Sequence, residues 1–487
     1  MIFGLDIGVF IFMILCLLLV GIFEFINGFH DTANAVAPVI YTKSLKAKKA
    51  VLIAGIMNFL GVVFGGIGVA MAIIHLLPLD AISFQSEVFG ISVVISLLLS
   101  AIIWNFSTWY FGLPASSSHS LIGAILGVTI VMMFLPINGN VEVVPNWQKA
   151  LEVIESLLFS PFIGFLFASI IMLFSLKYIK NKYYFSTPSK KHNSAPTRGL
   201  RSILIVTSAW VSFAHGSNDG QKGVGLAMLI LVILAPNIFA INPEIKIDDL
   251  NKNIIGIQNN LNSINLNLLN ETELNNIYNT HIDLNSIREK INSTGSYDKK
   301  ELRKSVLSFS NNIKKLDLIF SNNTLASNLY IVSVVNSDNI IEKNLNKSDL
   351  TLNDNISGIL KIIDYAPIWV VLFISISLGL GTMIGRKRIV ITIGEKIGKT
   401  DMNYAQATTS AFITAITITI ASKFHLPVST THILSSSVAG TMSVGPKSAG
   451  VRSGTVRNIL LAWVLTLPVT MFLSGGIFFI MWTILVK

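Results

Sequence analysis

Two aspartates stand in apolar surroundings, where a charged side chain is costly. Asp31 lies in F-I-N-G-F-H-D-T-A-N-A and Asp219 in H-G-S-N-D-G-Q-K-G, both rich in small and amide residues. A charge at a bilayer centre costs at least about 2.5–3.5 kcal/mol on insertion scales, so such residues usually face a cavity or a partner. Carboxylate and amide oxygens suit Na⁺, a divalent ion or a proton. The glycines and asparagines also favour a broken helix at each aspartate.

One lysine stands out in the second motif. Lys222 has the place that Asn34 has in the first motif. We expect these two side chains to be neighbours, each facing the aspartate of the other motif. Lys222 then either holds an anionic substrate as a point charge or forms an ion pair with Asp31 that substrate or proton breaks.

A second pair of motifs carries three hydroxyls each, in L-P-A-S-S-S-H at 113–119 and L-P-V-S-T-T-H at 426–432. Pro114 and Pro427 suit the first turn of a helix, where no backbone donor is lost. Helix N-termini present free N–H groups and a positive dipole end, and therefore bind oxyanions. Two such termini predict a site for a tetrahedral oxyanion such as phosphate; simple helix capping is the plainer alternative.

Histidines and one further acid accompany these motifs. His119 and His432 close the hydroxyl runs, and they fit a proton relay or plain packing equally well. The same holds for His30 and His215 beside the aspartates. Glu24 lies about two helical turns before Asp31 and suits either a cation path or an interfacial position.

The two kinds of motif recur as an internal repeat. The aspartate motifs are offset by 188 residues and the hydroxyl motifs by 313, and the polar, Asn-rich stretch 241–364 accounts for the difference. We interpret this stretch as an extramembrane insert, a loop or small cap with short helices over 250–270 and 300–317. The predicted divisions are a first repeat 1–180, a basic linker 181–201, the start of a second repeat 202–240, the insert 241–364 and the remainder of the second repeat 365–487.

Composition places the motifs in a membrane. The 487 residues are 52% hydrophobic and only 13% charged, with a mean hydropathy of +0.65, whereas an average soluble protein is roughly a quarter charged. Apolar stretches long enough to cross a hydrocarbon core of about 30 Å recur at 50–77, 89–111, 159–176, 366–385 and 458–486. These stretches are too long and unbroken for barrel strands. We predict an all-α, polytopic transmembrane helical bundle.

The net charge of +10 reports membrane orientation and does not indicate a nucleic-acid partner. The insert carries 15 acidic and 13 basic residues, so the basic excess lies elsewhere. Loops 43–49, 177–201, 386–399 and 447–457 are basic and belong on the cytoplasmic side by the positive-inside rule. This assignment puts both termini and the insert outside and inverts the two repeats relative to each other.

Several other functions find no support in the sequence. The only cysteine, Cys16, excludes an internal disulfide or thiolate cluster. Walker and H-E-x-x-H motifs are absent. A phosphatase would need a nucleophile beside a base, yet the Ser-His pairs at 118–119 and 431–432 are adjacent in sequence and face different ways on a helix. A phosphate sensor with the insert as its signalling part stays open.

With these motifs in view, the chain resembles the inorganic phosphate transporter (PiT) family, above all its bacterial low-affinity members. The resemblance rests on residues 25–35, 112–119, 215–223 and 425–441 and spans the chain except the insert. It implies two inverted repeats with re-entrant helical hairpins, a homodimer, and a multi-pass protein of the bacterial cytoplasmic (inner) membrane. It further implies a secondary transporter that imports phosphate by alternating access, needs no cofactor and is not an enzyme.

The resemblance also implies roles for residues. Bacterial members suggest proton symport of hydrogenphosphate or its neutral complex with a divalent metal such as Mg²⁺. Lys222 in place of a family asparagine disfavours a full set of Na⁺ ligands. A Na⁺-coupled phosphate symporter and a permease for sulfate or a related oxyanion stay as alternatives. The predicted substrate-binding residues are Ser116, Ser117, Ser118, Ser429, Thr430, Thr431, Lys222, Asn34 and Asn218. The predicted coupling-ion residues are Asp31, Asp219 and Asn27, of which the two aspartates are also candidate metal ligands.

Overall fold

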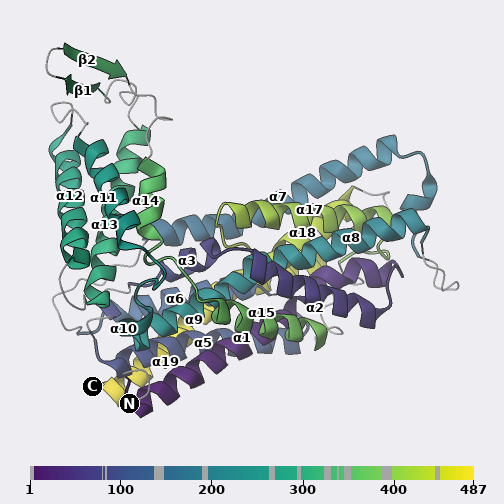
Figure 1. Ribbon diagram of the computed structural model, residues 1–487. Helices are drawn as coiled ribbons and strands as arrows, with labels where there is room; N and C mark the ends of the chain where they lie inside the picture. Colours follow the sequence, from purple (N-terminus) through teal and green to yellow (C-terminus); the bar gives the residue numbers. More distant parts are fainter. Residues whose placement is uncertain are drawn as a thin grey trace. The chain divides into compact units, whose positions relative to one another are not determined.

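The computed structural model divides the chain into two compact units (Figure 1). One unit comprises Met1–Leu234 and Ala366–Lys487, and the other Ala235–Tyr365. The residues that the structure describes are 5–78, 81–82, 85–113, 115–136, 147–188, 196–262, 269–292, 298–322, 331–336, 339–344, 352–384, 397–444 and 450–486.

In the described part of the larger unit the regular elements are helices, with one isolated β-bridge between Gly398 and Val451. Five of its helices, over Ile7–Tyr41, Ala47–Phe64, Glu87–Tyr110, Ala150–Tyr178 and Ser453–Val486, are long and apolar enough to cross a membrane. This agrees with the predicted polytopic helical bundle. The elements in chain order are α1 (Ile7–Tyr41), α2 (Ala47–Phe64), α3 (Gly68–Ile74), α5 (Glu87–Tyr110), α6 (Ser117–Met132), α7 (Trp147–Tyr178), η1 (Lys182–Phe185), α8 (Arg198–His215), η2 (Gly216–Gly220), α9 (Gln221–Leu234), α15 (Ile368–Ile384), α17 (Tyr404–Lys423), α18 (Thr430–Ser443), α19 (Ser453–Met481) and η6 (Trp482–Val486).

Helix packing in this unit pairs the two sequence repeats. Helix α1 packs on α15 and α2 packs on α8, while α6 packs on α19 and α18 packs on α7. The glycines of the two aspartate motifs sit at equivalent contacts. A Cβ on Gly28 would lie 2.9 Å from the Thr382 nitrogen, and one on Gly216 would lie 2.9 Å from the Asn58 carbonyl carbon. Small residues thus let the backbones approach closely, as is typical of membrane helices.

A glycine also allows close contact between α6 and α19. A Cβ on Gly127 would lie 2.7 Å from the Met471 Cα, and Ser474 stands on the same face of α19. Gly440 of α18, which is equivalent to Gly127 in the sequence repeat, lies equally close to the backbone of Phe165 in α7. The tight contact is therefore present in both repeats.

We expect Gly127→Ala to lower the stability of the larger unit. The added methyl group must push α6 away from the backbone of α19, and overpacking of this kind costs about 1–3 kcal/mol. Thermal unfolding of detergent-purified protein measures the loss. Gly476→Ala is the matched control, because no atom lies within 4 Å of a Cβ there. An unfolding temperature as high for Gly127→Ala as for Gly476→Ala would contradict the predicted contact.

Contacts link the four basic loops on one side of the larger unit. The Arg201 guanidinium donates to the Ser44 carbonyl at 2.9 Å, which joins the first two loops. Tyr183 of the second loop stacks at 5.5 Å on Tyr404, the first residue of α17, which follows the third loop. The Lys399 amide donates to the Gly450 carbonyl at 2.8 Å. The described parts of these loops therefore share one side, while the N- and C-termini lie together at the other end of this unit in Figure 1.

The smaller unit has its own apolar core. Its described elements are α10 (Pro236–Phe239), α11 (Ile247–Asn262), α12 (Glu271–Asn292), α13 (Lys299–Asn322), β1 (Ile331–Asn336), β2 (Asn339–Asn344) and α14 (Leu352–Leu360). The core residues of α11 to α14 recur at helical spacing and include Ile254, Leu284, Phe309 and Ile359. The predicted short helices at 250–270 and 300–317 correspond to α11 and α13. The hairpin of β1 and β2 departs from the all-α prediction.

The two ends of the smaller unit meet. The Asn242 amide donates to the Ile362 carbonyl at 2.7 Å, and the Tyr365 hydroxyl donates to the Phe239 carbonyl at 3.0 Å. Burial raises the pKa of Tyr365 to about 12, so its hydroxyl stays protonated and available as a donor. The chain thus enters and leaves this unit at neighbouring points.

Candidate functional site

The two aspartate motifs adopt different backbones. Helix α1 runs without a break from Ile7 to Tyr41, so the predicted helix break at Asp31 is wrong. Gly28 serves close packing on α15 and does not end the helix. In the second motif, the π-helical turn Gly216–Gly220 separates α8 from α9 and carries Asp219. A π turn interrupts the regular ladder, and such turns are frequent at functional sites.

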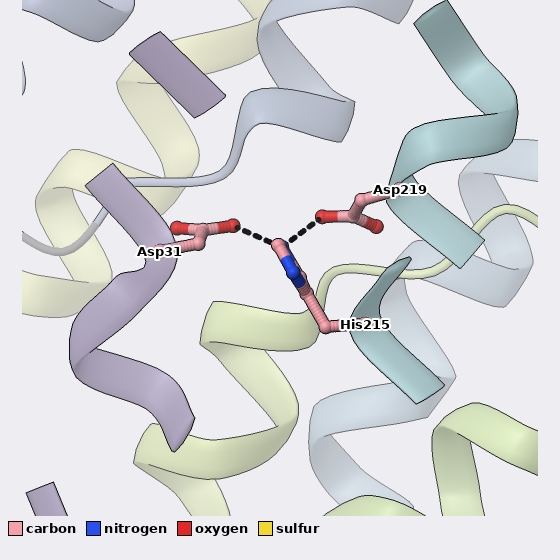
Figure 2. Close-up of side chains that lie close together, drawn as sticks. All are labelled: Asp31, His215 and Asp219. Atoms are coloured by element: carbon pink, nitrogen blue, oxygen red, sulfur yellow. Dashed lines mark ion pairs between the residues drawn. The ribbon is translucent and has the colours of Figure 1, made fainter. Parts of the chain in front are cut away.

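Asp31, His215 and Asp219 meet in one buried cluster (Figure 2). The His215 Nε2 atom lies 3.4 Å from Asp31 Oδ2 and 3.2 Å from Asp219 Oδ2. The ligand atoms of the three side chains lie within 4.8 Å of one another, which makes the cluster a candidate cation site as well. The sequence repeat alone did not show that one imidazole would bridge both aspartates.

Asn58 orients this imidazole. The Asn58 amide oxygen lies 3.0 Å from His215 Nδ1, while its Nδ2 donates to the Thr382 hydroxyl at 2.8 Å. Because the amide oxygen only accepts, Nδ1 carries a proton and Nε2 is the atom that faces the carboxylates. The sequence analysis missed Asn58. An isolated amide within the apolar stretch 50–77 was the available signal.

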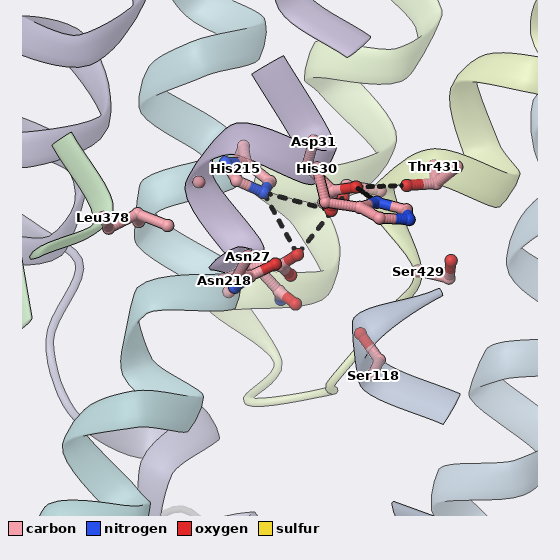
Figure 3. Close-up of polar contacts among 12 residues, drawn as sticks. Asn27, His30, Asp31, Ser118, His215, Asn218, Leu378, Ser429 and Thr431 are labelled. Carbon is pink, nitrogen blue, oxygen red and sulfur yellow. Dashed lines mark hydrogen bonds and ion pairs between the residues drawn. The ribbon is translucent and has the colours of Figure 1, made fainter. Parts of the chain in front are cut away.

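The N-terminus of α18 points at both aspartates. The Thr431 hydroxyl donates to Asp31 Oδ1 at 2.8 Å (Figure 3). The Thr430 hydroxyl lies 3.3 Å from Asp31 Oδ2 and 3.2 Å from Asp219 Oδ2. The helix begins at Thr430, after Pro427, so the prediction of Pro427 in the first turn is wrong; Pro114 lies outside the described residues. The hydroxyl motif and the aspartate motifs form one site, with the positive end of a helix dipole at the carboxylates.

The first residue of each hydroxyl run caps its helix. Ser116 and Ser429 are the N-caps of α6 and α18, and each side chain accepts from the backbone of a histidine three residues on, His119 or His432, at 3.2 Å. For these two serines the plainer alternative, capping, describes the structure. Ser117 is buried in the first turn of α6.

Lys222 is enclosed by acceptors. Its ammonium group donates to Asp219 Oδ1 at 2.5 Å, to the Val428 carbonyl at 3.1 Å and to the Ser118 hydroxyl. The side chain is 1% exposed, and its three N–H groups have three partners. The expected pairing with Asp31 across the repeat is wrong, because Lys222 and Asp219 stand three residues apart on one helical face.

The three predicted asparagines have different places. Asn218 binds the connection between α17 and α18: its Nδ2 donates to the Ser422 hydroxyl and the Leu426 carbonyl, and its Oδ1 accepts from the Val428 amide. Asn27 donates to Glu24 at 3.2 Å. The side chain of Asn34 lies outside the described residues.

The histidines that close the hydroxyl runs pack against each other. The rings of His119 and His432 lie 4.6 Å apart, and His432 stacks on Trp463 at 3.9 Å. This arrangement favours packing over a proton relay for the pair. His30, in contrast, contacts the site, with Nδ1 2.9 Å from Asp31 Oδ1.

Comparisons with known proteins agree on one family. Residues 27–474 match the model of the phosphate transporter family. The chain is 42% identical to the low-affinity inorganic phosphate transporter of Buchnera aphidicola subsp. Acyrthosiphon pisum (strain APS), over 96% of both chains. It is 38% identical to the low-affinity inorganic phosphate transporter PitA of Escherichia coli (strain K12), over 98% of both. A solved structure titled the sodium-dependent phosphate transporter matches with a TM-score of 0.54 at 20% identity, over 97% of this chain and all of that one.

Proposed function

The chain belongs to the phosphate transporter family, and from this premise we propose that it imports inorganic phosphate across the bacterial inner membrane by proton symport. Its relatives are transporters, and the chain is a transporter and not an enzyme. The substrate is hydrogenphosphate or its neutral complex with a divalent metal. The carrier works by alternating access and binds near the middle of the membrane.

The main observation behind this proposal is a threonine hydroxyl that lies close to both aspartates. Thr430 lies within hydrogen-bond distance of both Asp31 and Asp219. A hydroxyl has one proton to donate, so it cannot serve a carboxylate and a phosphate oxygen together. When a proton or cation occupies the aspartates, Thr430 and Thr431 are released to donate to the substrate. Loading of the cation and loading of phosphate are thereby coupled.

Phosphate would lie between the N-termini of α6 and α18. From α18, Thr431 would supply a neutral donor, and from α6 the Ser118 hydroxyl would exchange its hydrogen bond to the Val428 carbonyl, at 2.8 Å, for one to phosphate. The Lys222 ammonium lies against Ser118. The positive helix ends add to the attraction for an oxyanion. Asp31 and Asp219 would hold the coupling proton or the accompanying metal.

The pairwise packing of the two repeats supports alternating access. Exchange of one repeat for the other converts the contact of α1 with α15 into that of α8 with α2, and the contact of α6 with α19 into that of α18 with α7. A carrier built from equivalent halves can open to either side by moving one half against the other. The inverted orientation, the re-entrant hairpins and the homodimer stay predictions.

Phosphate uptake into proteoliposomes tests the proposal. Purified protein is given labelled phosphate under an inward proton gradient, with and without Na⁺. We expect uptake that requires the proton gradient and is indifferent to Na⁺. Uptake that depends on Na⁺ would support phosphate as the substrate but contradict the proton as the coupling ion. An excess of sulfate that abolishes uptake at every pH would favour the broader oxyanion permease.

We expect deletion of residues 245–360 to leave the rate of phosphate uptake within about twofold of the wild-type rate. A twofold change corresponds to much less than the roughly 1.4 kcal/mol of a tenfold change. The hydrogen bond between Asn242 and Ile362 holds the two ends together, so a short Gly-Ser linker can join them without strain. The same uptake assay measures the result. If the deletion variant folds but its phosphate uptake is lost, the result would favour the role of the insert as a phosphate sensor.

A further inference from the structure

A third carboxyl lies buried in the larger unit apart from the two aspartates. Glu24 stands in the middle of α1, seven residues before Asp31 and thus on the same helical face two turns away. Its side chain is 0% exposed. The Oε2 atom accepts from Asn27 Nδ2 at 3.2 Å, while Oε1 has no hydrogen-bond partner among the described residues.

A second oxygen without a donor lies beside it. Asn27 Oδ1 is also buried and has no hydrogen-bond partner in the described part of the chain. Buried acceptors are nearly always satisfied in native proteins, and an orphan costs free energy. Gly223 of α9 stands directly against Glu24, since a Cβ there would lie 2.6 Å from Oε1. The described part of the chain thus leaves room for the carboxyl and supplies a donor to Oε2 but none to Oε1.

The nearby cations are already engaged. In the described part of the chain, the charged or titratable groups near enough to interact electrostatically with Glu24 are His215, Asp219 and Lys222. All three N–H groups of Lys222 have acceptors, and His215 lies between the two aspartates. Helix α15 has no titratable residue, and α5 has them only at its ends. An ionised Glu24 would therefore be a buried charge without a counterion, which is very costly.

We infer that Glu24 is a proton-carrying site of the transporter, separate from the aspartate pair, and that the proton on Oε1 crosses the membrane with phosphate. A proton satisfies the orphaned Oε1 by turning it into a hydroxyl that can donate to Asn27 Oδ1. A divalent cation would require about six oxygen ligands, whereas only two orphaned oxygens meet here. This inference rests on the proposed proton symport.

Proton movement in liposomes tests the inference. Vesicles hold a pH-sensitive dye, and phosphate is added outside while labelled phosphate uptake is measured in parallel. For Glu24→Gln, which mimics the protonated form permanently, we expect the ratio of protons to phosphate to fall by the one proton that Oε1 carries in the wild type. Glu87→Gln is the matched control, because Glu87 is an exposed acid at the start of α5. Its ratio should equal that of the wild type.

The outcomes separate the inference from the proposed function. A wild-type protein that moves phosphate and protons, together with a Glu24→Gln variant of unchanged ratio, overturns the inference and leaves the symport standing. A wild-type protein without phosphate-linked proton influx overturns both. Gly223→Ala gives a second variant, because its methyl group displaces the Glu24 carboxyl; it too should lower the ratio, and an unchanged ratio counts against the role of Glu24.

A chemical test on the wild-type protein covers the case in which the variants do not fold. A lipid-soluble carbodiimide reacts with a protonated carboxyl: the O–H adds across one C=N bond, and the resulting O-acylisourea rearranges to a stable N-acylurea without a leaving group. We expect mass spectrometry to find this adduct on Glu24 in step with loss of uptake. Complete inhibition with Glu24 unmodified would overturn the inference.

Discussion

We expect Asp31→Asn to abolish proton-driven phosphate uptake while the protein remains folded in the membrane. The amide oxygen can still accept from Thr431, and His215 still has Asp219, so the helices keep their contacts. The variant cannot hold a proton or cation at Asp31. Since the proposed coupling requires a proton or cation at this site, we expect uptake to fall at least about 100-fold, which corresponds to about 2.8 kcal/mol.

The same helix offers the control for this variant. Asp6 is an exposed aspartate that caps the start of α1, with its carboxylate accepting from the Gly8 amide at 2.8 Å. Asp6→Asn has the same chemical change outside the site and should transport at the wild-type rate. Labelled uptake is compared at equal amounts of reconstituted protein. Uptake by Asp31→Asn equal to that by Asp6→Asn would remove Asp31 from the coupling site.

We expect Lys222→Met to lower both the stability of the protein and its phosphate transport. The ammonium group contacts Asp219, Ser118 and the Val428 carbonyl in a fully buried place. Methionine fills the volume but leaves Asp219 without its cation and the Ser118 oxygen without the Lys222 donor, while the Val428 carbonyl keeps the Ser118 hydroxyl as its donor. We expect the free energy of unfolding to fall by about 3–5 kcal/mol, as is usual when one partner of a buried ion pair is removed.

A double variant separates the charge from the fold. Lys222→Met with Asp219→Asn removes both charges, so its yield and thermal unfolding should return toward the wild type while phosphate uptake stays absent. Lys423→Met, at the exposed end of α17, controls for loss of a lysine in general. If the double variant is no more stable than Lys222→Met, then the ion pair is not what stabilises this region. If it transports phosphate, Lys222 does not bind substrate.

Periodicity and repetition carried most of the fold prediction. Helical spans follow from the length of apolar stretches, because the bilayer sets how many residues must be apolar. Matched motifs predict equivalent helices in the two repeats. Gly28 and Gly216, for example, both lie against the backbone of a neighbouring helix. The helices of the insert were predicted in part, but the hairpin of β1 and β2 was not, because strands of six residues are too short to show a clear period of two.

Most residues of the site could also be predicted from the sequence, but their hydrogen-bond and ion-pair partners could not. A charged residue in an apolar stretch is costly to bury, so its presence indicates a functional site. This reasoning led to Asp31, Asp219 and Lys222 as candidate site residues. Their partners depend on how helices from distant parts of the chain meet. The sequence could not place Asn58 on His215, or keep Lys222 on Asp219 and away from Asp31.

By itself the sequence determined that this chain is a helical membrane protein of two repeats, with acids and hydroxyl runs at matched places, because burial of polar groups in lipid restricts composition position by position. Only the tertiary structure decided that Thr430 would lie between two carboxylates and that the Glu24 carboxyl would have an oxygen without a donor. The physical reason is that hydrogen bonds depend on distances of a few tenths of an ångström between helices far apart in sequence. Such distances are set by packing and leave no periodic trace in the sequence.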